Sequence, residues 1–259
     1  VGVLLFGKNP QKFYPNSRVT VVIYPGRSVG TKHIDLRDFE GTLFKIIDDV
    51  DDFIKKNTHT YSYLKKKQVP RESIPQYPYF VIRELLVNAV AHRDYNLSGA
   101  RAIIKIFEDR IEYQSPGPLP KGITPENITE EVYHRNPILM KVLSKVKYVE
   151  EIGEGWNRVI EETKNHPLKP KAPKIEDTGL SVIVTIYSPE KLELMGMDLN
   201  ERQKKIIKFI EKNKRMTTSQ CAHLLNVSND TALRELLKLR SLGLVGQKGV
   251  GRGTYYTIK

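Results

Sequence analysis

The stretch "VIRELLVNAVAHRDYNLSG", residues 81–99, combines an apolar helical pattern with polar residues along one edge of the same helix. Each helical residue turns by ~100°, so Ile82, Leu85, Leu86 and Ala89 share one side. Glu84, Asn88 and His92 follow one another at intervals of four and line the neighbouring edge. That edge is either the solvent side of an ordinary amphipathic helix or the polar wall of a binding site.

Two glycine-bearing loops follow this helix in the chain. The first, "SPGPLP", contains Gly117, and the second, "EEIGEGWNR", contains Gly153 and Gly155 directly before a segment with helical periodicity. Glycines let backbone N–H groups close around phosphate oxygens, and a helix N-terminus adds partial positive charge. A single glycine pair is weak evidence, but the ordered combination with Glu84 and Asn88 favours a nucleotide site.

This order of motifs resembles the ATP-binding fold shared by DNA gyrase, the Hsp90 chaperone, histidine kinases and the MutL proteins. A closer resemblance rests on "GVLLFGKNPQKFYP", "DFEGTLFKIID", "ELLVNAVAHRDY", "SPGPLPKGITPENI", "RNPILMKVL" and "EEIGEGWNRVI". These segments are similar to a prokaryotic family of transcriptional regulators related to the C-terminal region of the RecG helicase. The resemblance covers about residues 2–187 and implies an α+β fold, with a two-layer α/β sandwich of the gyrase/Hsp90 type.

The resemblance also implies roles for individual residues. Glu84 matches the glutamate that orients and deprotonates the attacking water in members that hydrolyse ATP. Asn88 matches the asparagine that holds Mg²⁺ against the triphosphate, and an amide oxygen is a hard ligand of the kind Mg²⁺ prefers. Gly117 matches the glycine of the first loop, and Gly153 and Gly155 match those of the loop that covers the nucleotide. The implied cofactors are ATP or another nucleotide, with Mg²⁺.

One departure concerns the adenine end of the expected site. Active ATPases of this fold carry an aspartate two residues before the first-loop glycine, whereas this chain has Ser115. A serine hydroxyl can still bond to adenine, but without charge. We include Ser115, His92 and Asp94 among the expected nucleotide contacts. For Asp94 a helix-capping or salt-bridge role is the alternative.

Composition and missing motifs exclude several classes of protein. The chain has no G-x-x-x-x-G-K-[ST] loop and therefore no P-loop helicase motor. We expect a weak ATPase at most. No apolar run approaches the ~20 residues that a membrane span needs, and no signal peptide is visible. The single cysteine, Cys221, lies in an apolar helical pattern and is expected in a core. One cysteine argues against a disulfide framework and for a reducing compartment, which indicates a cytoplasmic protein.

Positive charge is concentrated near the C-terminus. Residues 200–259 contain 13 Lys and Arg against 4 Asp and Glu, a net +9 of the chain's total +12. The pattern there predicts a helix, two further helices joined by "NVS", and two strands around the glycine-rich tip "GVGRG". It resembles the winged helix-turn-helix of bacterial and archaeal repressors. A basic module of this kind favours double-stranded DNA as a partner, and protein contact alone is the alternative.

The second helix of that pair is expected to read bases in the major groove, since one helix fits there. Its first exposed residues are the candidates for base contacts: Asn229, Asp230, Thr231, Leu233 and Arg234. Four basic side chains are positioned for phosphates: Lys238, Arg240, Lys248 and Arg252.

Three domains are expected along the chain. Residues 1–75 are interpreted as the end of an upstream AlbA-like (Schlafen-type) region with linking strands and a helix. Residues 76–190 are expected to form the ATP-binding-type sandwich, and residues 195–259 the winged helix. "GVLLFG" is expected to form a strand, and "VPRESIPQYP" and "HPLKPKAPKIEDTG" are expected to be links without regular structure.

These observations predict a DNA-binding transcriptional regulator with a nucleotide-binding domain. One alternative is an ATPase whose Glu84-dependent hydrolysis drives conformational change or closure of a homodimer on DNA. Another is a scaffold that retains only the remnant of a pocket.

Overall fold

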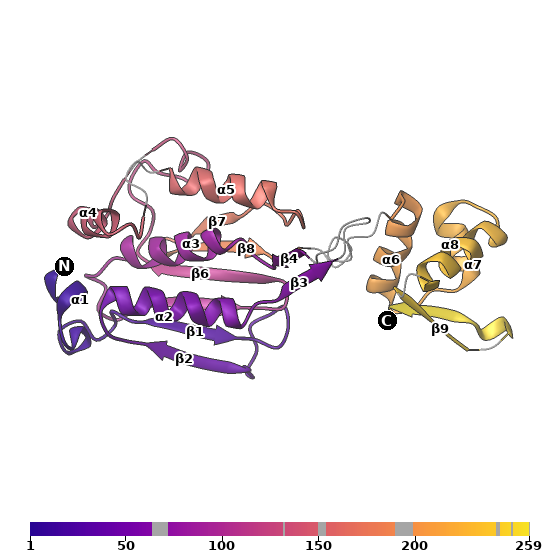
Figure 1. Ribbon diagram of the computed structural model, residues 1–259, viewed down its shortest axis with the longest axis horizontal. Helices are drawn as coiled ribbons and strands as arrows, with labels where there is room; N and C mark the ends of the chain where they lie inside the picture. Colours follow the sequence, from indigo (N-terminus) through magenta and orange to yellow (C-terminus); the bar gives the residue numbers. More distant parts are fainter. Residues whose placement is uncertain are drawn as a thin grey trace. The chain divides into compact units, whose positions relative to one another are not determined.

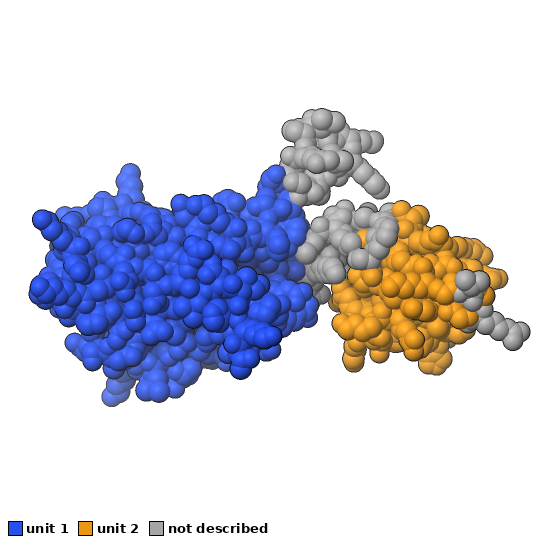
Figure 2. Space-filling view, turned by 90° about the horizontal axis from the view of Figure 1, so that it is seen from below, with its two compact units in different colours: residues 1–190 blue, residues 191–259 orange. Residues whose placement is uncertain are grey.

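The computed structural model describes residues 1–63, 72–131, 133–149, 154–189, 199–241, 244–249 and 251–258. The chain forms two compact units, residues 1–190 and 191–259, which Figure 2 colours separately. Each unit has its own apolar core. In these residues no helix combines the length and the apolar character needed to cross a bilayer.

The first unit is built on a six-stranded sheet with the order β2-β1-β5-β6-β8-β7. The strands are β1 (Val19–Ile23), β2 (Asp35–Phe39), β5 (Ala102–Ile106), β6 (Arg110–Pro116), β7 (Lys174–Asp177) and β8 (Ser181–Tyr187). Only β1 and β5 run parallel to each other, and the other neighbours are antiparallel. Strands β5 and β6 pair as an antiparallel hairpin around "FEDR", residues 107–110.

The sheet has one covered face and one open face. In β6, Ile111, Tyr113 and Ser115 are buried, whereas the residues between them are partly exposed. Successive side chains of a strand point to opposite faces, so this alternation places Tyr113 and Ser115 on the covered face. The arrangement is the predicted two-layer α/β sandwich.

Helices α2 (Leu43–Lys56), α3 (Tyr79–Ala91) and α5 (Gly155–Asn165) lie side by side over the sheet (Figure 1). The middle helix, α3, packs against both α2 and α5 and onto β6. Because it has neighbours on several sides, its apolar residues are buried around most of its circumference. A shorter helix, α4 (Pro137–Lys145), precedes α5. The helical patterns expected within residues 81–99 and after Gly155 are confirmed as α3 and α5.

Some local predictions are wrong. The segment "GVLLFG" forms a short helix, α1 (Gly2–Phe6), because adjacent Leu4 and Leu5 are both buried while Phe6 is exposed. A short apolar run does not by itself distinguish a strand from a buried helical turn. Both expected links contain a strand: β4 (Glu72–Pro75), which pairs with β3 (Thr60–Tyr63), and the charged edge strand β7. The sequence "YSYLKKK", residues 61–67, is typical of a strand, and the part of it after Tyr63 lies outside the described residues.

The boundary expected between residues 75 and 76 does not separate two compact units. Strand β1 pairs directly with β5 along its whole length, from Val19 to Ile23. Residues 1–190 accordingly form one compact unit.

The second unit has the order of a winged helix. It contains α6 (Glu201–Asn213), α7 (Thr218–Leu225), α8 (Asn229–Ser241) and the antiparallel strands β9 (Val245–Lys248) and β10 (Tyr255–Ile258). A 3₁₀ turn, η2 (Gly251–Gly253), lies between the strands. Cys221 is fully buried, as predicted, and burial raises the pKa of its thiol to about 11.

Candidate functional site

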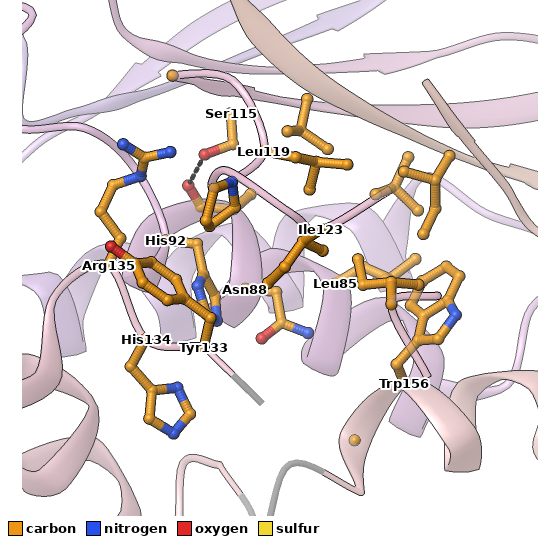
Figure 3. Close-up of a pocket in the computed structure, with 18 of the residues that line it drawn as sticks. Leu85, Asn88, His92, Ser115, Leu119, Ile123, Tyr133, His134, Arg135 and Trp156 are labelled. Atoms are coloured by element: carbon orange, nitrogen blue, oxygen red, sulfur yellow. Dashed lines mark hydrogen bonds between the residues drawn. The ribbon is translucent and has the colours of Figure 1, made fainter. Parts of the chain in front are cut away.

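A cavity of about 180 Å³ lies between α3 and the covered face of the sheet (Figure 3). Helix α3 contributes its Glu84–Asn88–His92 edge, and β6, β7 and β8 contribute the floor. The loop between β6 and α4, together with the start of α5, completes the lining. Of the expected nucleotide residues, the structure brings six to this cavity: Glu84, Asn88, His92, Ser115, Gly117 and Gly155. Gly153 lies outside the described residues.

Glu84 and Asn88 form a buried polar pair on α3. Only 6% of Glu84 is exposed, which excludes the solvent-side interpretation for this residue. Nδ2 of Asn88 donates to Oε1 of Glu84 across 3.2 Å, as residues one helical turn apart can. The bond fixes the amide, so that its oxygen is the atom left for a donor or a cation.

Gly155 opens α5 directly against Glu84. A Cβ built at Gly155 would lie 1.9 Å from Oε1 of Glu84, closer than any real contact. The glycine is therefore required here by the close approach of α3 and α5. The next residue, Trp156, lines the cavity beside Leu85, and Figure 3 shows both at the end away from Arg135.

His92 and His134 lie together at the polar end of the cavity. Their ring centroids are 6.0 Å apart, and Arg135 and Tyr133 lie beside them (Figure 3). Burial lowers the pKa of His92 to about 4, and His134 and Arg135 lower it further by repulsion. His92 is therefore neutral at pH 7. Nδ1 of His134 is buried without a hydrogen-bond partner, so it is a polar atom that a ligand could satisfy.

The hydroxyl group of Ser115 lines the cavity, and its proton is already used in a hydrogen bond to the backbone. Its hydroxyl is buried on β6 and donates to the carbonyl oxygen of Ala89 on α3 across 2.8 Å. A hydroxyl has one proton to donate and two lone pairs. With its proton engaged, Ser115 offers the cavity an acceptor.

Gly117 and Asp94 are placed differently from each other. Gly117 has a φ of +102°, a conformation that favours glycine, and its backbone lines the cavity. Asp94 does not line the cavity: Oδ2 pairs with Arg135 at 3.6 Å, and Oδ1 accepts from the backbone N–H of Asn96. Of the two alternatives given for Asp94, helix capping and a salt bridge, the salt bridge is present in this geometry.

The loop between β6 and α4 supplies residues that sequence reasoning missed. Tyr133, His134, Arg135 and Ile123 line the cavity, but a loop has no period that would place them there. The loop is tied to α3 by Asn136, whose Nδ2 donates to the carbonyl oxygens of Ala91 and Arg93 at 2.8 Å each. Arg135 also donates to the carbonyl oxygen of Pro118. These bonds set the loop over the His92 end of α3.

The described residues contain no group of three or more His, Cys, Asp or Glu arranged to hold a metal ion. On α3, Asn88 and Glu84 are the candidate protein ligands for a cation in the cavity, and a complete coordination shell would need further oxygens from the ligand or from water.

The candidate DNA interface lies on the second unit. Ser228 caps α8, since its Oγ accepts from the backbone N–H of Thr231 at 3.3 Å. Asn229, Asp230, Leu233 and Arg234 are exposed on the first turns of α8, and Thr231 is partly buried with its hydroxyl bonded to Ser228. These positions are where a recognition helix presents its side chains to bases.

The four basic side chains expected to contact phosphates differ in their location and in their bonds to the rest of the unit. Lys238, Arg240 and Lys248 are exposed. Arg240 donates from Nη1 to the side-chain oxygen of Gln247, which links α8 to the strand β9 of the wing. Arg252 lies in the 3₁₀ turn at the wing tip, between β9 and β10. Leu237, which sequence reasoning did not single out, is also exposed on α8.

Comparison with known families finds a match within each unit. Residues 99–186 match the family described as "Putative ATP-dependent DNA helicase recG C-terminal", and residues 202–255 match the DeoR-like helix-turn-helix domain. The first match spans β5 to β8, and Glu84 and Asn88 precede it in the chain. The chain thus contains a RecG C-terminal-type, ATPase-like domain followed by a DeoR-like helix-turn-helix domain, and the resemblance predicted from the sequence is confirmed.

Among solved structures, the DIP2311 protein from Corynebacterium diphtheriae is similar, with a TM-score of 0.64 and 20% sequence identity. The alignment covers 100% of this chain and 53% of that one, so this chain spans about half the length of that protein. At this identity the likeness shows a shared fold. No curated protein matches this sequence.

Proposed function

We propose that this chain, which joins a RecG C-terminal-type, ATPase-like domain to a DeoR-like helix-turn-helix domain, is a cytoplasmic DNA-binding transcriptional regulator. The observation that carries the proposal is the exposed, basic reading face of a helix-turn-helix. Arg234 and Lys238 lie on α8, and Lys248 lies on the wing strand. Residues 200–259 carry a net +9, which attracts the phosphates of double-stranded DNA.

The first unit would act as the sensor of the regulator. Its cavity is lined by the motif residues that the fold uses for a nucleotide, and it has a polar and an apolar end. Asn88 offers an amide oxygen that suits Mg²⁺, because its Nδ2 is already bonded to Glu84. A nucleotide-type ligand in this cavity would contact α3, β6 and the loop between β6 and α4 together. Such a ligand would bias DNA binding only if it favoured one conformation of the chain.

ATP hydrolysis is a second candidate, and the adjacency of Glu84 and Asn88 in the cavity favours it. A general base needs to reach a water that attacks the phosphate. In this structure Glu84 is buried against Gly155, which leaves no room for such a water on that side. We therefore favour a ligand sensor over an ATPase that drives conformational change.

The test of the proposal is DNA binding by the full chain, measured for the wild type and for Arg234→Ala. The variant should bind its preferred site about 5- to 150-fold more weakly, which corresponds to ~1–3 kcal/mol, and discriminate less between sequences. ATP turnover by the same wild-type sample separates the two candidates. Turnover that disappears in Glu84→Ala supports the ATPase, and the absence of turnover supports the sensor.

A further inference from the structure

Two leucines are exposed on α8, the helix proposed to lie in the major groove. Leu233 is 37% exposed and Leu237 is 42% exposed. They are one helical turn apart, so their side chains are neighbours on the surface of the helix. A different row of α8 packs into the core of the second unit: Ala232, Leu236 and Leu239 are all fully buried. The two leucines therefore present apolar surface to whatever α8 contacts.

This apolar surface lies on the side of α8 that faces the wing. Leu233, Leu237 and Arg240 follow at i, i+4 and i+7, which places them in one row along the helix. At the end of this row, Arg240 donates to the side chain of Gln247 on β9. Arg234 is exposed ~100° further round the helix than Leu233. The leucines thus lie between Arg234 and the wing.

The chemistry of the major groove limits what a leucine can recognise there. A leucine side chain has no hydrogen-bond donor or acceptor, so it can favour a base only by apolar contact. Every base pair presents donors and acceptors in the major groove, and only thymine adds an apolar group, its C5-methyl. Against any other base, the leucine would cover polar atoms without pairing them, which is unfavourable.

Leu233 is the better placed of the two for a base contact. It follows the first turn of α8, and the N-terminal residues of a recognition helix are the ones that contact base edges. Leu237 lies one turn further along and extends the apolar surface beside it.

We propose that Leu233 selects a pyrimidine with a 5-methyl group, which is thymine in unmodified DNA, at one position of the target site. The proposal rests on the function proposed above, in that it names a chemical group read by the same helix. It gives Leu233 a role distinct from that of Arg234, because a guanidinium pairs with the acceptors of guanine.

Removal of a single methyl group from the DNA tests the contact. A preferred duplex is first selected from a randomised pool with the full chain. Each thymine is then replaced in turn by deoxyuridine, which keeps every hydrogen-bonding group of thymine but lacks the 5-methyl. We expect one replacement to weaken binding about fourfold in anisotropy titrations, the effect of burying one carbon. Wild-type binding that no replacement weakens overturns the proposal.

A leucine variant assigns the effect to Leu233. Leu233→Ala should bind the thymine and deoxyuridine duplexes about equally, and alanine is a strong helix former, so α8 should be retained. Leu224→Ala is the matched control, because Leu224 is also 37% exposed but lies on α7. The control should keep the preference of the wild type. A full preference for thymine in Leu233→Ala contradicts the assignment.

A modified cytosine distinguishes the two bases that can carry the methyl group. Cytosine and 5-methylcytosine are compared at the position where deoxyuridine weakens binding. Tighter binding of 5-methylcytosine shows that Leu233 reads the methyl group on either pyrimidine. Equal binding restricts the contact to thymine.

Exposed leucines also suit contact with a second copy of the chain, and sedimentation without DNA tests that alternative. A dimer that dissociates in Leu233→Ala, together with an unchanged preference for thymine, overturns the proposal. Failure of the proposed function gives a different result, since no duplex is then selected from the pool at low salt. A selected duplex whose binding ignores every thymine methyl leaves the regulator standing and removes only the role of Leu233.

Discussion

The carboxylate of Glu84 occupies the space in which any side chain at Gly155 would begin. The distance from a Cβ built at Gly155 to Oε1 of Glu84 is 1.9 Å, and to the carboxyl carbon it is 2.8 Å. The start of α5 thus rests on a buried acidic group of α3. This contact explains why a glycine follows Glu154 at the point where the helix begins, and it sets one wall of the cavity.

Gly155→Ala should destabilise the chain. The added methyl group forces Glu84 out of its bond with Asn88 or moves α5, and overpacking of this kind costs about 1–3 kcal/mol of the free energy of unfolding. Denaturant unfolding followed by circular dichroism measures the change.

The contact between Glu84 and Gly155 can be tested by a double-mutant cycle. In a Glu84→Ala background the space beside Gly155 is open, so Gly155→Ala should cost much less there. Gly99→Ala is the control, because nothing lies within 4 Å of a Cβ at that position. Equal costs of Gly155→Ala in the two backgrounds would show that the two residues are not in contact.

His92 should make stability depend on pH. Its folded pKa of about 4 lies below the ordinary value of 6.5, so the unfolded chain binds the proton more readily. The stability that comes from keeping His92 neutral is fully present above pH ~6.5 and is lost as the pH falls toward 4. The free energy of unfolding should differ by about 3 kcal/mol between these two pH values. Urea unfolding between these pH values should show stability rising with pH.

His92→Gln should flatten that dependence, since glutamine does not titrate. His33→Gln replaces an exposed histidine and should leave the pH dependence as in the wild type. The pKa of His166 is also lowered by burial, so part of the slope should remain in His92→Gln. An unchanged slope in His92→Gln would mean that His92 is accessible to protons in the folded chain.

Arg234 and Lys248 should affect DNA binding in different ways. Arg234 is exposed one turn into α8 and can reach a base edge, so Arg234→Ala should blur sequence preference. Lys248 lies at the end of the wing strand β9 and is expected at a phosphate. Lys248→Ala should weaken all sequences about equally and lower the salt slope by about one unit. Gel shifts on specific and scrambled duplexes separate the two; equal loss of specificity in both variants would contradict these roles.

Helices and strands long enough to repeat their apolar pattern several times were predictable from the sequence, and the short ones were not. Helix α2 repeats its apolar positions over four turns, and Ile46, Ile47, Val50 and Ile54 are all fully buried. The short α1 offers too few residues for a period. Strand β7 lies at the sheet edge, and three of its four residues, Lys174, Glu176 and Asp177, are charged, so its composition resembles that of a link.

For the site, the sequence predicted the wall formed by α3 and the glycines but not the loop. Glu84, Asn88 and His92 are spaced by the helix itself, so a local pattern fixes their common edge. The positions of Tyr133, His134 and Arg135 depend on long-range bonds, such as those from Asn136 to the end of α3. No local pattern encodes such bonds. The orientation of Ser115 is likewise set by a residue on another element, Ala89.

The most direct test of the regulator is the salt dependence of duplex binding by the full chain, followed by fluorescence anisotropy. Each neutralised phosphate releases ~0.9 of a counterion, so log K should fall linearly with log salt with a slope of several units. Replacing Arg234, Lys238 and Lys248 together with alanine should lower that slope. Replacing exposed Lys12, Lys45 and Lys121 of the first unit, which removes the same charge, should not. No binding of the wild type to any duplex at low salt would contradict the account and assign the winged helix to protein contacts.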